Sequence, residues 1–112
     1  MAKDLNLVWL LDCYRGLLTA RQQEAMAFYY EEDLSLSEMA EAMDITRQAA
    51  HDLLQRSTTQ LQEWETQIGM VRRYREADAF LEGLQTALID ETTPRAVLLD
   101  MAQQFIARWK TE

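Results

Sequence analysis

Apolar residues recur every three or four positions through most of the chain, which is the spacing of one buried helix face. A first helix is predicted from a cap at Asp4 to about Arg15, with its end marked by Gly16. A second helix begins after Thr19, which forms a capping box with Gln22. The inward positions of these helices are predicted to be Leu7, Val8, Leu11, Tyr14, Leu18, Ala25, Met26, Phe28, Tyr29 and Tyr30.

The acidic run Glu31-Glu32-Asp33 follows the second helix. Negative charges are unfavourable at a helix C-terminus, so we expect this run to form a solvated loop. A binding role for the three carboxylates is the alternative interpretation.

The stretch from Leu36 to Leu53 is the most informative part of the chain. Ser35 and Glu38 form a second capping box, Asp44 is expected in a left-handed turn, and Thr46 caps the next helix. The inward residues are predicted to be Leu36, Met39, Ala40, Met43, Ile45, Ala49, Ala50, Leu53 and Leu54. Two short helices joined by a tight turn are typical of a helix-turn-helix, whose second helix can enter a DNA major groove.

Long helices are predicted for the C-terminal half. The second helix of the motif meets no breaker before Gly69, Met70 to Ile89 forms another helix, and Thr93-Pro94 starts the last one. Their apolar positions include Leu61, Trp64, Ile68, Val71, Tyr74, Ala77, Leu81, Leu84, Leu88, Val97, Leu98, Met101, Ala102, Phe105, Ile106 and Trp109. This is more apolar surface than so small a bundle can cover, so we expect a homodimer formed by this half.

Length and composition narrow the structural class of the protein. Together they favour one all-α domain over 1–112, with a helix-turn-helix bundle at 4–57 and dimerising C-terminal helices at 58–112. Eleven basic and nineteen acidic residues give a net charge of −8, which opposes binding to phosphate. We expect no membrane insertion, because no stretch approaches the length of a span. The single Cys13 and the absence of a signal-peptide pattern indicate a reduced, cytoplasmic protein.

Several separated segments carry a family resemblance. They are Leu17-Leu18-Thr19-Ala20-Arg21-Gln22-Gln23, Tyr29-Tyr30, Glu31-Glu32-Asp33, Leu34 to Glu41, and Thr46-Arg47-Gln48-Ala49-Ala50-His51-Asp52. From about Leu18 to Leu61 the chain resembles region 4 of bacterial sigma factors, which reads promoter DNA. From Asp4 to Tyr74 it more closely resembles the YlxM-like family of small bacterial helix-turn-helix proteins, although Ala50 and Asp44 depart from the usual pattern.

The resemblance implies a sigma region 4-like bundle and a tie to the signal recognition particle. Members of the family are typically encoded beside the protein components of that particle, and some are described as dimers. The resemblance therefore implies a regulatory or interaction protein in co-translational targeting, with the particle's protein GTPase or its RNA as partner. A dimeric transcription regulator that binds duplex DNA is the alternative.

The exposed side of the second motif helix supplies the candidate binding residues. They are Thr46, Arg47, Gln48, His51, Gln55 and Arg56, together with Arg21 at the start of the second helix. Arg47 could contact guanine, Gln48 could contact adenine, and Arg21 could hold a phosphate. The alternative is an ordinary solvated helix face. Between Leu34 and Gln60 four acids outnumber two bases, and Asp52 lies on the same face, which is unlike a DNA reader.

A second, weaker candidate is the basic run of Arg72, Arg73 and Arg75. It could grip RNA phosphate while Tyr74 stacks on a base, or it could be a solvated helix face. The chain offers no set of nucleophile, base and acid and no glycine-rich phosphate loop, so we expect no enzyme activity and no cofactor. His51 has no second His or Cys at ligand spacing, so we expect no metal site.

Overall fold

The computed structural model describes residues 5–111, and the predicted cap at Asp4 lies outside them. The elements are α1 (Leu5–Tyr14), a 3-10 turn (Arg15–Leu17), α2 (Ala20–Met26), a π-helical turn (Ala27–Glu31), α3 (Leu36–Met43), α4 (Arg47–Ile68), α5 (Met70–Ile89) and α6 (Arg95–Thr111). The described part of the chain contains no strand, which confirms the all-α class. No helix within it is long and apolar enough to cross a membrane.

The chain divides into two compact units, 1–71 and 72–112. The first unit therefore reaches well past Ser57, where the sequence suggested the bundle would end. The reason is that α4 continues as one helix to Ile68, and Leu61 in its second half is fully buried. Each unit is described separately below.

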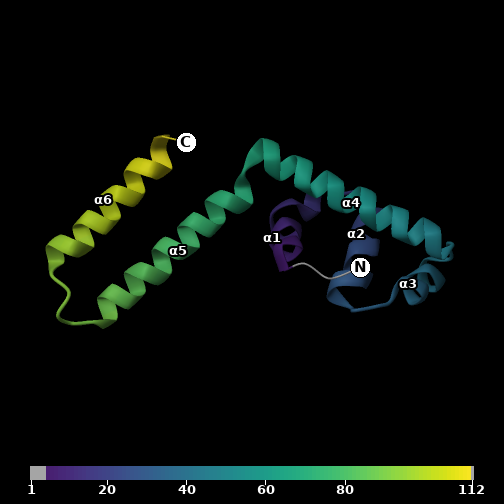
Figure 1. Cartoon of the computed structure of the whole chain (residues 1–112), viewed down its shortest axis with the longest axis horizontal. Helices are drawn as coiled ribbons and strands as arrows, with labels where there is room; N and C mark the ends of the chain where they lie inside the picture. The colour runs from purple at the N-terminus through teal and green to yellow at the C-terminus, as the bar shows by residue number, and fades with distance from the viewer. Residues whose placement is uncertain (1–4, 112) are drawn as a thin grey trace. The chain divides into compact units, whose positions relative to one another are not determined.

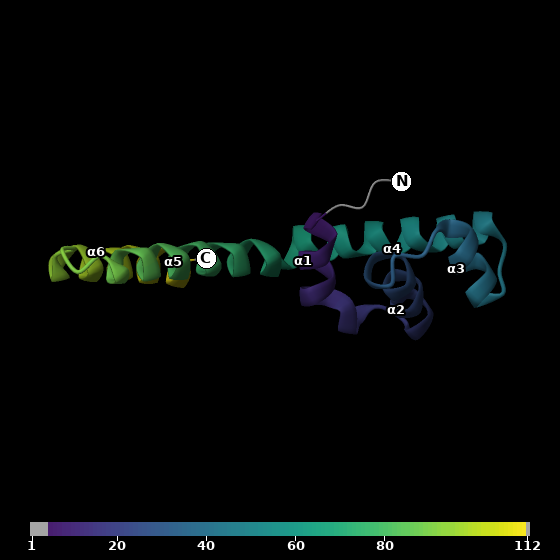
Figure 2. The same ribbon diagram turned by 90° about the horizontal axis from the view of Figure 1, so that it is seen from below.

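In the first unit, three short helices pack along α4 (Figure 1). Figure 2 shows α1, α2 and α3 on the same side of α4. The core is built from residues of α1 to α4, of the segments between them and of the start of α5, namely Leu7, Leu10, Leu11, Tyr14, Leu18, Ala25, Met26, Tyr29, Met39, Ala40, Met43, Ala50, Leu54, Leu61 and Val71. Alanine at Ala40 and Ala50 lets the backbones of α3 and α4 approach closely at the point where the motif turns.

The local signals at the helix starts are confirmed. Thr19 and Ser35 each form a complete capping box, with backbone-to-side-chain hydrogen bonds of 2.9–3.2 Å. Asp44 adopts the left-handed conformation with φ 55°, and Thr46 Oγ1 accepts a 3.0 Å hydrogen bond from the amide of Ala49. These bonds satisfy amides that have no partner inside the helix.

Three details differ from the sequence expectations. Val8 and Ala49 are exposed, because helical packing buries Leu10 and Ala50 next to them instead. The helical path of α2 extends through a π turn to Glu31, so the loop starts one residue later than expected. The carboxylate of Glu31 pairs there with Arg15.

The end of α4 is tied to α1 by a small hydrogen-bond network. Tyr14, only 3% exposed, donates a 2.6 Å hydrogen bond from its hydroxyl to Glu65 Oε1. The same hydroxyl accepts from the amide of Met70, and Glu65 Oε1 accepts from the amide of Val71, both at 2.9 Å. Burial, reinforced by the bond to Glu65, raises the pKa of Tyr14 to about 12.

The second unit is a hairpin of α5 and α6 with a thin interior. Phe80 stacks on Phe105 at 4.4 Å between ring centres, and Gly83 leaves room for Met101. None of the described residues of this unit is fully buried. The interior therefore holds the two helices together without forming a closed core.

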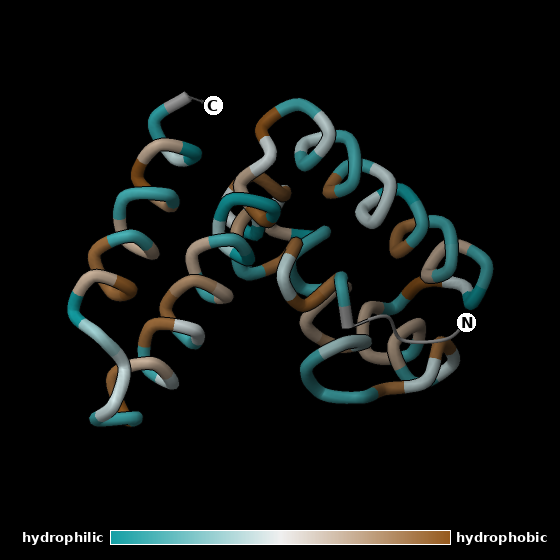
Figure 3. Tube along the Cα trace, turned by 60° about the vertical axis from the view of Figure 1, so that its left-hand side comes forward, coloured by the Kyte–Doolittle hydropathy of each residue, from teal (hydrophilic) through white to brown (hydrophobic). Residues whose placement is uncertain are grey.

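The hairpin has one apolar face. Tyr74 and Leu81 each follow an inward-facing residue of α5, and Ile106 follows inward-facing Phe105 of α6. Each residue of a helix is turned by about 100° from the one before it. Because α5 and α6 are antiparallel, the residues that follow inward-facing ones in the two helices lie on the same face of the hairpin. This apolar hairpin face consists of Tyr74, Leu81, Leu88, Leu99 and Ile106, which are 49–59% exposed. Figure 3 shows the alternation of hydrophobic and hydrophilic positions along the chain.

The cap at Thr46 gives a first testable prediction. Thr46→Ala removes the acceptor for the Ala49 amide and should lower the free energy of unfolding by about 0.5–2 kcal/mol. Thr59→Ala is the matched control, because Thr59 is exposed inside α4, where alanine is the better helix former. Urea denaturation measures both, and equal effects would contradict the capping role.

Tyr14 gives a second prediction, on alkaline stability. Its pKa is about 12 in the folded chain against a reference of 10.0, so the folded state holds the proton more tightly. The resulting stabilisation is fully present below pH 10, decreases from pH 10 to 12 and is absent above that. The stability difference between the unaltered chain and Tyr14→Phe should therefore shrink across this range in urea denaturation. A difference independent of pH would refute it.

Candidate functional site

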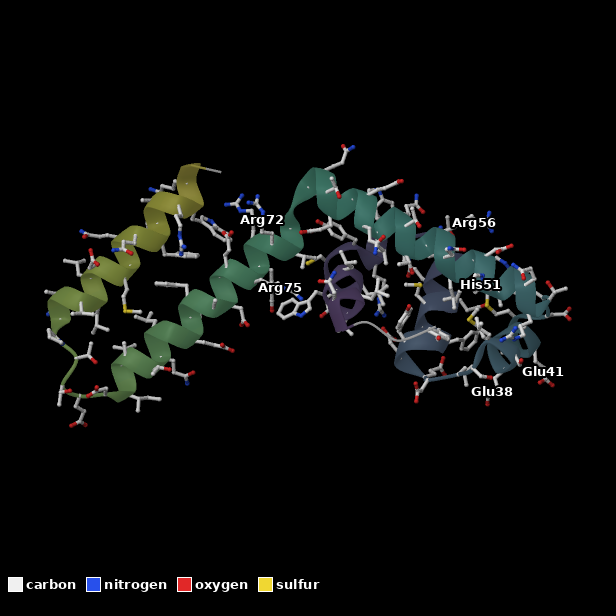
Figure 4. All side chains as sticks on the ribbon, viewed as in Figure 1. Glu38, Glu41, His51, Arg56, Arg72 and Arg75 are labelled. Carbon is white, nitrogen blue, oxygen red and sulfur yellow. The ribbon has the colours of Figure 1, made fainter. Side chains whose placement is uncertain are left out.

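The first half of α4 presents the predicted binding residues. Thr46, Arg47, Gln48, Gln55 and Arg56 are exposed, and the side chain of His51 is 40% exposed. The left-handed turn at Asp44 and the cap at Thr46 fix the start of the helix. Gln48, Gln55 and Arg56 lie on the side of α4 away from the fully buried Ala50 and Leu54. Arg47 precedes Leu54 by two turns and is exposed because it stands at the start of the helix. The predicted residues are here called the α4 face, and Figure 4 labels His51 and Arg56 among them.

The α4 face is partly engaged in its own hydrogen bonding. Gln48 Nε2 donates a 3.0 Å hydrogen bond to Asp52 Oδ1, one turn later on the helix. The same oxygen lies 3.7 Å from Nδ1 of His51, which has no hydrogen-bond partner among the described residues. The bond leaves Gln48 with a second N–H donor and its carbonyl oxygen, but a base bonded there would also meet the carboxylate of Asp52.

Arg47 lies where the starts of α3 and α4 come together. It lines a hollow with Leu36, Gln48 and His51. A neighbouring hollow shares Leu36 and Arg47 and is completed by Tyr29, Asp33, Leu34, Ser35 and Glu38. Leu36 was assigned to the core by its spacing, but it is only half-buried and contributes apolar surface beside Arg47. Its position as the first residue of α3, at the edge of the packed region, is the signal that could have shown this.

Acidic side chains surround these hollows. Glu38 and Glu41 are exposed on α3, which packs against α4, and Asp44 is exposed in the turn (Figure 4). The hydrogen bonds from the backbone amide and side chain of Ser35 lower the pKa of Glu38, so this carboxylate carries its charge at neutral pH. The α4 face is therefore a surface of mixed charge, unlike the basic surface that a DNA-binding helix normally presents.

Arg21 is exposed at the start of α2, as predicted. Gln22 Nε2 donates a 2.9 Å hydrogen bond to Gln60 Oε1, which places the start of α2 beside the middle of α4. Gln60 follows Arg56 by one helical turn. The start of α2, where Arg21 is exposed, thus lies beside the part of α4 that follows the α4 face.

The basic run of Arg72, Arg73 and Arg75 belongs to the second unit, and its three side chains differ in exposure. Arg72 and Arg75 are exposed (Figure 4). Arg73 is half-buried, with its guanidinium 4.2 Å from the ring centre of Trp109, and its Nη2 donates a 3.0 Å hydrogen bond to the carbonyl of Trp109. Arg73 therefore closes the hairpin at the end of α6, and it is poorly placed to hold phosphate.

The remaining reactive group, Cys13, packs against the core of the first unit. Burial, assisted by the negative charges of Glu65 and Asp12, raises the pKa of its thiol. A raised pKa disfavours the thiolate, which is the nucleophilic form. Within the described residues, no group of three His, Cys, Asp or Glu side chains could hold a metal ion.

The comparison with known proteins agrees with this geometry. Residues 1–100 match the model of the UPF0122 family, described as "Putative helix-turn-helix protein, YlxM / p13 like". UPF0122 protein STH1464 of Symbiobacterium thermophilum is 46% identical over 87 residues, which are 77% of this chain and 81% of that protein. UPF0122 protein BH2485 of Halalkalibacterium halodurans is 32% identical, over 86% of this chain and 88% of that protein. This chain belongs to the UPF0122 family of YlxM/p13-like helix-turn-helix proteins.

Proposed function

We propose that this protein is a regulatory binding protein of the signal recognition particle pathway, and that its α4 face contacts the protein GTPase of the particle. The link to the pathway rests on the resemblance to YlxM-like proteins described above. The choice of a protein surface as the target rests on the chemistry of the α4 face. The α4 face has mixed charge, and a hydrogen bond holds the carboxylate of Asp52 beside Gln48.

The charge balance carries the argument. Between Leu34 and Gln60 the exposed ionised side chains are the acids Glu38, Glu41, Asp44 and Asp52 and the bases Arg47 and Arg56. A nucleic-acid backbone would place its phosphates next to these acids and lose the counterion-release energy that drives most such binding. A basic protein surface with a few acidic groups complements the same pattern.

The test is binding of the purified GTPase, measured by titration calorimetry. Asp52→Asn removes the charge but keeps an oxygen that can accept from Gln48, so the helix should be unaffected. We expect the affinity to fall by about two- to fivefold, the range of one exposed ion pair. Glu91→Gln is the matched control, because Glu91 is an exposed acid in the turn between α5 and α6 and is not part of the α4 face, and it should leave the affinity unchanged. Lack of binding to the GTPase, or equal losses in both variants, would reject the proposal.

A second candidate function is DNA reading by a dimer. It is favoured by one observation: Arg47, Gln55 and Arg56 are exposed on the helix that a helix-turn-helix places in the major groove. The same preparation, titrated with mixed duplex DNA at increasing salt, distinguishes the two functions. A DNA reader loses affinity steeply with salt, and Arg47→Ala would relax its base preference. Our proposal expects no duplex binding even at low salt.

The apolar hairpin face supports assembly into a homodimer. A two-helix hairpin without fully buried residues has too little core to be stable by itself, and Leu81 and Leu88 remain 59% and 58% exposed. Pairing this face with the same face of a second copy would form a four-helix bundle around a two-fold axis. Such a dimer would present two copies of the α4 face to the partner.

The dimer is tested by light scattering at micromolar concentration, where we expect twice the chain mass of 13.1 kDa. Leu81→Glu combined with Leu88→Glu should return the mass to that of one chain, because two charges would be buried in the bundle. Thr86→Glu is the control, since it adds a charge on α5 away from the apolar hairpin face. A single-chain mass for the unaltered protein would defeat the dimer.

A further inference from the structure

The passage from α4 to α5 takes a single residue. α4 ends at Ile68 and α5 begins at Met70, and Gly69 between them is left-handed, with φ 71° and ψ 23°. Its amide donates a 2.8 Å hydrogen bond to the carbonyl of Glu65. Glycine adopts this conformation and the right-handed helical one at similar cost, so Gly69 itself does not dictate that α4 should end.

What ends the helix is the network described above. The first amides of a helix lack partners inside it, and Gly69 has no side chain to cap them. In this chain Tyr14 accepts from the amide of Met70, and Glu65 accepts from that of Val71. A carboxylate at a helix start is also favoured by the helix dipole. The start of α5 thus depends on a hydroxyl supplied by α1, 56 residues earlier in the chain.

The amides of Met70 and Val71 would have other hydrogen-bond acceptors, two backbone carbonyls of α4, in an alternative conformation of the junction. If Gly69 took the right-handed conformation, Met70 and Val71 would bond the carbonyls of Thr66 and Gln67 in the usual helical pattern. α4 and α5 would then be one continuous helix. The two arrangements satisfy the same donors. The observed one has in addition the bonds to Tyr14 and Glu65 and the burial of Val71 in the core of the first unit.

We propose that Tyr14 and Glu65 form a releasable lock on a two-state junction at Gly69. In the locked state α4 ends at Gly69, and in the released state α4 and α5 join into one helix. The lock makes the start of α5 depend on how α1 packs against α4. A partner that draws Tyr14 away from α4 would switch the junction. The proposal does not depend on the identity of that partner.

A distance measurement between two spin labels distinguishes the states. Gln62→Cys and Glu82→Cys introduce labels at exposed positions on either side of Gly69, in a Cys13→Ser background. In a continuous helix these positions are about 30 Å apart, at 1.5 Å per residue, and a break at Gly69 shortens that distance. Dilution into unlabelled protein removes distances between copies. We expect the unaltered junction to give a main population shorter than 30 Å.

Tyr14→Phe combined with Glu65→Ala should raise the population near 30 Å several-fold. Thr59→Ala combined with Glu63→Ala is the matched control and should leave the distribution unchanged, because both residues are exposed on α4 outside the network. Gly69→Ala should shift the distribution in the same direction, because alanine disfavours the left-handed conformation. This variant leaves Tyr14 and Glu65 in place, so it keeps the test valid if the double variant fails to fold. An unchanged distribution in the folded double variant or in Gly69→Ala, or a main population at 30 Å before any change, would overturn the proposal.

Discussion

The first unit depends on one continuous apolar stripe along α4. Ala50, Leu54 and Leu61 lie on it at intervals of one or two turns, and each is fully buried. The helices α1, α2 and α3 are too short to be stable alone, since isolated helices of this length are marginal in water. Their capping boxes and turns fix where they begin and end, but it is contact with this stripe that keeps them folded.

The same stripe explains why the candidate site is well defined. Burying one side of α4 turns Gln48, Gln55 and Arg56 to the other side. Arg47 is exposed at the start of the helix, which Asp44 and Thr46 fix. The shape needed for groove binding is therefore present. The charge is less suitable, because the carboxylate of Asp52 lies beside Gln48, and Glu38 and Glu41 are exposed on the adjoining helix. Shape and charge point to different partners, and charge contributes more to the free energy of binding a nucleic-acid backbone.

The second unit, unlike the first, has no closed core. Its helices are held by a few aromatic contacts and by Arg73 over Trp109, and its largest aliphatic side chains remain exposed. Exposed leucines on one face of a helical hairpin carry an energetic cost in water that is removed when another apolar surface covers them. The first unit thus has a closed core, whereas the second leaves apolar surface uncovered.

The sequence by itself determined the all-α class, the starts of α2, α3 and α4 and the left-handed turn at Asp44. The three helix starts and the turn depend on residues within four positions, where capping and turn chemistry act. Gly69 marked where α4 could end, but the bond from the Met70 amide to Tyr14 of α1 was visible only in the tertiary structure. Tertiary structure alone decided which of several neighbouring apolar residues is buried, because helical spacing cannot choose between Val8 and Leu10 or between Ala49 and Ala50. It also decided the roles of Arg73, Gln48 and Tyr14. Their partners Trp109, Asp52 and Glu65 are selected by side-chain geometry and, for Trp109 and Glu65, by contacts between residues far apart in the chain, which no local pattern records.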